Sequence, residues 1–164
     1  MSERRDRELD QFYAVTYARL VGVVGAISGD RGEAEEAVQE AFVRLLGCWR
    51  KVSRYEDPEA WVRLVALRQL SKQRRKRANG VRAALRHGPP DDVPAWTAHE
   101  VDLARAVAAL PMPQRAVIVL HRIGLDAAEM GRELGVPVGT VKSRLARARA
   151  ALAGLLREDL TDHA

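Results

Sequence analysis

The chain has 164 residues, with 27 Lys and Arg against 22 Asp and Glu, and a formal net charge of +5. Hydrophobic residues make up 47% and charged residues 30%, a balance typical of a folded protein, because disordered chains contain less apolar sequence. The longest stretch without Asp, Glu, Lys or Arg covers only residues 20–29, about half of the roughly 20 residues that a membrane-spanning helix needs. The charged N-terminus leads into no signal-peptide core. We therefore expect a cytoplasmic protein without membrane insertion.

Metal and enzyme chemistry find little support in the sequence. Cys48 has no second cysteine with which to pair, and the four histidines lie far apart, so no zinc-ligand pattern is present. A Gly-rich phosphate loop and a nucleophile elbow are also missing. We expect no metal, no cofactor and no enzymatic activity.

Residues that break helices gather in one stretch, 78–97. It includes Asn79-Gly80 and the string His-Gly-Pro-Pro-Asp-Asp-Val-Pro at 87–94, all typical of turns and loops. This composition predicts a flexible linker over 78–97 between a domain at 8–77 and a second domain at 98–157. Because period-2 strand patterns are nearly absent, the predicted fold class is all-α, with two small helical domains.

A helix over 33–49 is predicted in the first domain, with Asp30 as N-cap and Glu33 completing a capping box. At about 100° per residue, one arc of this helix is apolar and is the predicted core face: Ala34, Val38, Ala41, Phe42, Leu45 and Trp49. The opposite arc carries Glu36, Gln39, Glu40 and Val43. This second arc is either a solvated face or a docking face for a partner helix.

The next helix begins at Asp57-Pro58, with Asp as N-cap and Pro at the first helical position. Its predicted apolar side consists of Trp61, Leu64, Val65 and Leu67. Residues 68–86 contain eight Lys or Arg and no acidic residue. A run of positive charges with no acidic residue among them favours a polyanionic partner. Nucleic acid is favoured over a membrane surface.

A helix-turn-helix is predicted in the second domain. Asp126 and Glu129 have the spacing of a capping box, and Leu125 and Met130 that of a hydrophobic staple, so a short helix begins there and ends at 134. The string Gly135-Val-Pro then turns the chain into a last helix over 138–156. This spacing is typical of DNA-binding helix-turn-helix units.

The last helix has an apolar stripe and a basic side. The stripe comprises Val141, Leu145, Ala148 and Leu152. The outer side comprises Gly139, Lys142, Ser143, Ala146 and Arg147, flanked by Arg144 and Arg149. Lys142, Ser143 and Arg147 supply donors for base edges. Thr140 lies in the first turn, where a hydroxyl and free backbone N–H groups bind phosphate.

These strings resemble the extracytoplasmic-function (group 4) sigma factors of the sigma-70 family of bacterial RNA polymerase. The polymerase-binding helix of region 2 is similar to Glu35-Glu36-Ala-Val-Gln39-Glu40-Ala-Phe42. The region that opens and reads the minus-ten element is similar to Tyr55-Glu-Asp-Pro58-Glu-Ala-Trp61-Val and the basic run after it. Region 4 is similar to Gly135-Val-Pro-Val-Gly-Thr140-Val-Lys-Ser-Arg-Leu-Ala-Arg147. The resemblance covers almost the whole chain.

The resemblance implies a role for each matching position. Contacts with the coiled coil of the largest polymerase subunit are implied for Glu36, Gln39, Glu40 and Val43. Minus-ten contacts, with a loop that captures a flipped base, are implied for Lys51, Ser53, Arg54, Tyr55, Trp61, Arg68, Lys72 and Arg75. Minus-thirty-five contacts are implied for Thr140, Lys142, Ser143, Arg144, Ala146 and Arg147. Further implied partners are the flap of the second-largest subunit and an anti-sigma factor.

Two positions depart from the family pattern. Arg68 stands where many members carry Asn, and is either a partly buried cation or a DNA contact. Ala146 stands where some relatives carry a larger residue, so a base contact is lost and the preferred promoter sequence altered.

The resulting hypothesis is a sigma factor that brings core polymerase to selected promoters and helps to melt them. The alternative is a stand-alone helix-turn-helix regulator whose first domain dimerises or binds an effector. The arc of Glu36, Gln39 and Glu40 argues against that alternative, since a dimerising helix presents an apolar seam.

Overall fold

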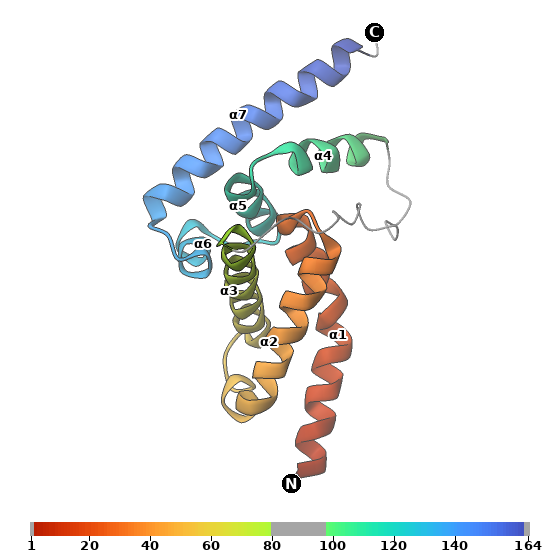
Figure 1. Cartoon of the computed structure of the whole chain (residues 1–164), viewed down its shortest axis with the longest axis vertical. Coiled ribbons are helices and arrows are strands. Elements are labelled where there is room, and N and C mark those ends of the chain that lie inside the picture. Colours follow the sequence, from red (N-terminus) through yellow and green to blue (C-terminus); the bar gives the residue numbers. More distant parts are fainter. Residues whose placement is uncertain (1, 80–97, 163–164) are drawn as a thin grey trace. The chain divides into compact units, whose positions relative to one another are not determined.

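The computed structural model describes residues 2–79 and 98–162, and this part of the chain consists of helices without strands. The all-α prediction is therefore confirmed. The chain divides into two compact units between Pro89 and Pro90 (Figure 1). Most of the predicted linker, 80–97, lies outside the described residues. The helices are α1 (Ser2–Ser28), α2 (Arg31–Val52), α3 (Pro58–Asn79), α4 (Ala98–Ala109), α5 (Met112–Arg122), α6 (Ala127–Leu134) and α7 (Val138–Asp162).

The first unit is a bundle in which α1, α2 and α3 all pack against one another (Figure 1). Its core contains side chains from all three helices with at most 1% exposure: Leu20, Val24 and Ile27, then Val38 and Leu45, then Val62 and Leu70. Burying each contributes about 1.5 to 3 kcal/mol. None of the described helices is long and apolar enough to cross a membrane.

The start of α2 confirms the predicted N-cap but corrects the predicted capping box. Asp30 Oδ1 accepts a hydrogen bond from the Glu33 N–H at 3.0 Å. The reciprocal bond is absent, because the Asp30 N–H donates to Ser28 Oγ and the Glu33 carboxylate turns toward α3 instead. The predicted core arc of α2 is buried throughout: Ala34, Val38, Ala41, Phe42, Leu45 and Trp49.

Helix α3 begins as predicted, with the Ala60 N–H donating to Asp57 Oδ1 at 3.0 Å. Its predicted apolar side is mostly wrong. The buried residues are Val62, Arg63, Ala66, Leu67 and Leu70, whereas Trp61, Leu64 and Val65 are only half-buried. Apolar residues occupy nearly every position from 61 to 67, so helical periodicity alone cannot select the stripe that α1 and α2 cover.

An ion pair joins α1 to the start of α3. Arg19 donates from Nε to Glu59 Oε1 at 2.9 Å and from Nη2 to Glu59 Oε2. The hydrogen bonds that Arg19 donates to Glu59, and then the negative charge of Glu59, raise the pKa of the Arg19 guanidinium above its ordinary value.

In the second unit α7 packs against α4, α5 and α6. The core includes Leu110, Val117, Leu120, Met130, Val141 and Ala148, each at most 3% exposed. The predicted last helix is longer than expected, ending at Asp162 rather than at 156. From residue 144 to residue 158 only Gly154 interrupts the good helix formers, and one interior Gly costs about 1 kcal/mol, which is too little to end a packed helix.

The helix-turn-helix forms as predicted. Glu129 N–H donates to Asp126 Oδ1 at 2.8 Å, and Asp126 N–H donates to Glu129 Oε2 at 2.7 Å. Gly135 then takes a left-handed conformation with φ of 67°, which Gly adopts without steric cost. These local contacts set the angle at which α7 leaves α6.

Gly131 permits the close approach of the turn to α6. A Cβ atom at this position would lie 2.9 Å from the backbone oxygen of Val136. We expect Gly131→Ala to destabilise the second unit by about 1 to 3 kcal/mol, lowering its melting temperature by about 4 to 8 °C for each kcal/mol. Thermal unfolding of the full chain measures this, with Gly154→Ala as the control because a Cβ there meets nothing within 4 Å. Equal melting temperatures for the two variants would contradict the prediction.

Candidate nucleic-acid and partner interfaces

The outer side of α7 is exposed and basic. Lys142, Ser143, Ala146 and Arg147 are exposed, whereas Thr140 and Arg144 are half-buried. The opposite side of the helix carries Val141, Leu145 and Ala148 into the core. At about 100° per residue, the four exposed positions cover about 140° of the helix circumference, enough to face a major groove. Four of the six predicted minus-thirty-five positions thus share one exposed surface.

Two hydrogen bonds refine the chemistry of this surface. The Ser143 hydroxyl donates to the Thr140 backbone oxygen at 3.1 Å, so its oxygen is left mainly as an acceptor. The Thr140 N–H donates to Pro137 O at 3.0 Å. The Thr140 N–H is therefore not one of the free N–H groups expected at this helix start. The Thr140 side-chain hydroxyl remains the group predicted to bind a phosphate.

A second exposed face runs along α3. Trp61, Arg68, Lys72 and Arg75 fall within about 60° of one another at about 100° per residue, on the side away from Val62. Arg68, Lys72 and Arg75 are exposed and Trp61 is half-buried. The exposure of Arg68 removes the alternative of a partly buried cation at that position. The face combines three cations with one aromatic ring, as in surfaces that bind nucleic-acid bases and phosphates.

The turn before α3 is equally exposed. Lys51, Ser53, Arg54 and Tyr55 all lie at the surface, and Tyr55 keeps 39% of its area exposed. The backbone here is ordered by hydrogen bonds from Arg54 N to Lys51 O and from Tyr55 N to Val52 O. The turn therefore presents its side chains from a hydrogen-bonded backbone immediately before α3.

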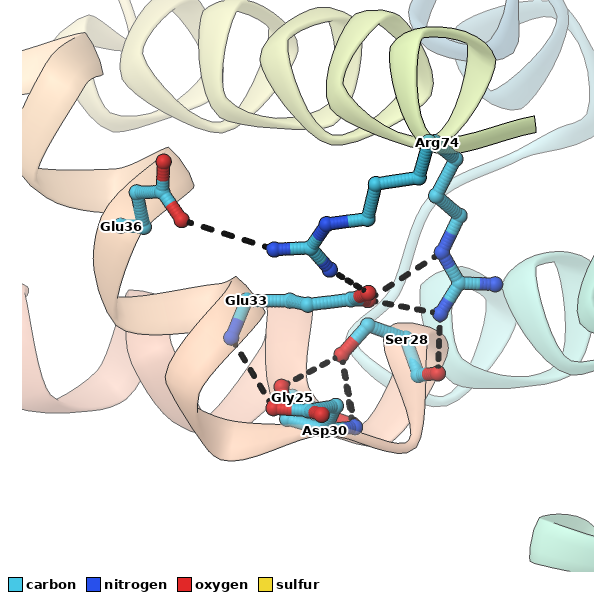
Figure 2. A network of polar contacts seen from close by, with 7 residues as sticks. Gly25, Ser28, Asp30, Glu33, Glu36 and Arg74 are labelled. Atoms are coloured by element: carbon cyan, nitrogen blue, oxygen red, sulfur yellow. Dashed lines mark hydrogen bonds and ion pairs between the residues drawn. The ribbon is translucent and has the colours of Figure 1, made fainter. Parts of the chain in front are cut away.

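Two of the cations predicted to be unbalanced have acidic partners. Arg74 donates from Nη2 to Glu33 Oε2 at 2.9 Å and to the Ser28 backbone oxygen at 2.5 Å (Figure 2). Arg77 Nη1 donates to Glu33 Oε1, and its Nη2 lies 3.8 Å from Glu36 Oε2. The expectation of a fully unbalanced basic run is thus wrong for Arg74 and Arg77, because helical spacing returns both to the side that faces α2.

The predicted docking arc of α2 is at the surface. Glu36, Gln39 and Val43 are exposed, and Glu40 is half-buried. Their side chains make light contacts: Gln39 Nε2 donates to Tyr17 Oη at 3.2 Å, and Glu40 accepts from Arg44 Nε at 3.2 Å. Surface pairs of this kind contribute about 0 to 1 kcal/mol, so little opposes their exchange for contacts with a partner.

Two apolar members of this surface were not predicted from the sequence. Leu46, one turn after Val43, is 67% exposed, and Tyr13 is 43% exposed. Tyr13 stacks on Tyr17, with ring centroids 4.9 Å apart. Because Tyr17 accepts the hydrogen bond from Gln39, this stacking places Tyr13 beside the docking arc. The available signal was Leu46 itself, a second large apolar residue one turn after Val43 on an arc whose other members are polar. Exposed apolar residues within a polar rim are typical of protein interfaces.

In the described residues, a helix-turn-helix in one unit and an exposed basic face on each of α3 and α7 favour a DNA-binding protein. Residues 12–80 match the family described as Sigma-70 region 2, and residues 100–152 match Sigma-70, region 4.

Relatives extend the match along the chain. The ECF RNA polymerase sigma factor SigM of Mycobacterium tuberculosis is 33% identical over 152 residues, 90% of this chain and 76% of that protein. SigE of Mycolicibacterium smegmatis is 32% identical over 158 residues, 89% of this chain but only 60% of that protein. The chain therefore belongs to the family of ECF RNA polymerase sigma factors, and the stand-alone regulator is not favoured.

A solved structure has the same fold. The sigma factor RpoE from Bartonella quintana, in complex with the anti-sigma factor NepR, aligns with a TM-score of 0.72 over 92% of this chain and 98% of that chain, at 24% identity.

Proposed function

We propose that this chain is an alternative sigma factor that binds core RNA polymerase and directs transcription initiation at selected promoters, without catalytic activity of its own. The observation that carries the proposal is the exposed arc of α2, where acidic, amide and large apolar side chains lie together. A regulator that needs only DNA has no use for such a surface, whereas a subunit recruited to a polymerase requires one.

In this proposal residues 8–77 form region 2, residues 78–97 the linker and residues 98–157 region 4. Region 2 binds the coiled coil of the largest polymerase subunit through Glu36, Gln39, Glu40 and Val43, to which we add Leu46. Region 4 binds the flap of the second-largest subunit. The protein acts in the cytoplasm, and an anti-sigma factor is a further proposed partner, as the solved RpoE is bound by one.

The minus-ten element is proposed to bind the exposed face of α3 and the turn before it. Lys51, Ser53, Arg54 and Tyr55 line the turn, and Trp61, Arg68, Lys72 and Arg75 line the helix. Unstacking one base costs a few kcal/mol, and stacking on an aromatic ring returns about 1 to 3 kcal/mol per base. Tyr55 and Trp61 are the aromatic side chains that this surface offers for that purpose.

The minus-thirty-five element is proposed to bind α7. Lys142, Ser143, Ala146 and Arg147 face the bases, while Thr140 and Arg144 contact phosphates. With its single methyl group, Ala146 makes at most an apolar contact, so we expect weak preference at the base pair that it faces.

Complex formation with bacterial core polymerase tests the proposal. The full chain is mixed with core polymerase, and size-exclusion chromatography measures whether they comigrate at micromolar concentration. The retained complex then selects duplexes from a promoter library. We expect a stable complex that enriches two separated sequence elements. Tight, specific duplex binding by the chain alone, without any complex with the core, would instead support the stand-alone regulator.

The side chain of Arg147 provides a residue-level prediction. Arg147→Ala should reduce selection of the upstream element by about 1 to 3 kcal/mol and relax specificity at one base pair, because an arginine fork discriminates guanine from other bases. Binding titrations against the preferred duplex and single-base variants measure the change. An equal loss on every sequence would mean that Arg147 contacts only phosphate.

A further inference from the structure

The second half of α3 lacks an apolar anchor. The last buried residue of this helix is Leu70, and all of residues 71–79 are exposed or half-buried. Five of the six residues from 72 to 77 are Lys or Arg, and no acidic residue lies among them. Like charges one helical turn apart destabilise a helix. This half of the helix therefore needs support from outside.

Glu33 supplies that support from α2. Its side chain is only 13% exposed and accepts from both Arg74 and Arg77, whose side chains are 34% and 49% exposed. Arg74 also donates to the Ser28 carbonyl at the end of α1, where a cation is favoured by the helix dipole. Glu33 thus joins α2 to the second half of α3, and Arg74 joins that half of α3 to the end of α1 (Figure 2).

The same contacts determine which cations face outward. Arg74 and Arg77 lie on the side of α3 that faces α2, whereas Lys72 and Arg75 lie with Arg68 on the exposed face. Rotation or fraying of this helix end would move the exposed cations relative to Trp61, which sits at the packed end. The positions of Lys72 and Arg75 on the exposed face of α3 therefore depend on the bonds that Arg74 and Arg77 make on the face toward α2.

We propose that Glu33 is a positioning residue for reading the minus-ten element: through Arg74 and Arg77 it holds the second half of α3, so that Lys72 and Arg75 stay in register with Trp61. Arg74 and Arg77 hold the helix and do not bind phosphate. The expected effect on transcription rests on the proposed function, whereas the role of Glu33 in holding the second half of α3 does not.

Two readouts on the full chain test the proposal with the variant Glu33→Gln. The first is hydrogen exchange of the backbone amides of residues 71–79 in the free protein, which we expect to accelerate about tenfold. The second is the ratio of transcription from the preferred minus-ten sequence to that from single-base variants, with core polymerase. We expect this ratio to fall roughly fivefold, the low end of what one base contact contributes.

Glu8→Gln is the matched control, because it removes the same charge from an exposed pair with Arg4 on α1, and both readouts should stay at wild-type values.

Arg77→Gln, which changes a half-exposed side chain, replaces Glu33→Gln in the test if that variant does not fold. It should accelerate the exchange and lower the promoter ratio, as expected for Glu33→Gln. Partial unfolding would reduce transcription equally on all promoters and leave the ratio unchanged, whereas loss of register lowers the ratio.

Unchanged exchange in residues 71–79, or an unchanged promoter ratio with accelerated exchange, would overturn the positioning role. A wild-type chain that directs no promoter-specific transcript would overturn the proposed function instead. In that case hydrogen exchange still decides whether Glu33 holds this end of α3.

Discussion

The double variant Glu36→Lys with Glu40→Lys should bind core RNA polymerase about a hundredfold or more weakly than the wild type. Both positions lie on the outward arc of α2, which is proposed to meet the largest subunit. Placing like charges against each other in an interface costs several kcal/mol, and about 2.7 kcal/mol corresponds to a factor of one hundred. Equilibrium titration of labelled protein with core polymerase measures the loss.

The control for this variant carries the same change in net charge elsewhere. Glu3→Lys with Glu8→Lys alters two exposed side chains of α1 and should leave polymerase affinity within about threefold, because distant exposed charges are screened by salt. Circular dichroism must show that both proteins are folded, since Glu36 lies near Arg77. Binding of the double variant to a minus-thirty-five duplex should be retained. Equal affinity of both double variants for the polymerase would show that the α2 arc is not part of the interface.

Leu120→Ala should unfold or nearly unfold the second unit while the first unit stays folded. Leu120 lies on α5 and is completely buried, and truncating such a leucine costs about 2 to 5 kcal/mol. A unit of this size has a total stability of about 3 to 10 kcal/mol on the usual scale per residue. The variant should lose binding to the upstream element and keep its affinity for core polymerase. Thermal unfolding of the full chain separates the two units when near-ultraviolet absorption follows the first unit, which holds every Tyr and Phe, and amide exchange follows both.

Ile123→Ala is the comparison for this experiment. Ile123 is 41% exposed, so its truncation should change stability by no more than about 0.5 kcal/mol. If Leu120→Ala also unfolds the first unit, the two units are not independent. If it leaves the melting of the second unit unchanged, the packing described for α5 is wrong.

Local signals predicted the parts of the fold that local contacts determine. The capping box of Asp126 and Glu129, with the left-handed Gly135, forms within ten residues of chain, so the helix-turn-helix was readable from its sequence. The core arc of α2 was equally readable, because its apolar residues repeat with the helical period and its polar residues occupy the other side.

Contacts between distant residues could not be predicted in this way. Glu33 satisfies the spacing of a capping box, yet its carboxylate pairs with Arg74, 41 residues further along the chain. The pairing depends on how α3 is rotated against α2, and the apolar residues on nearly all sides of α3 leave that rotation open. The apolar extension of the docking arc by Leu46 was missed for a related reason, since burial of a leucine is the ordinary expectation.

Single-round transcription by bacterial core polymerase, with and without the full chain, tests the central claim most directly. The template carries a promoter selected from a library by the complex of chain and polymerase, and matched templates have either the minus-ten or the minus-thirty-five element scrambled. We predict a transcript from one defined start that appears only with the chain and is lost when the minus-ten element is scrambled, and reduced when the upstream element is. Absence of such a transcript, although the chain is folded and the polymerase is active with another sigma factor, would show that the chain does not act as a sigma factor.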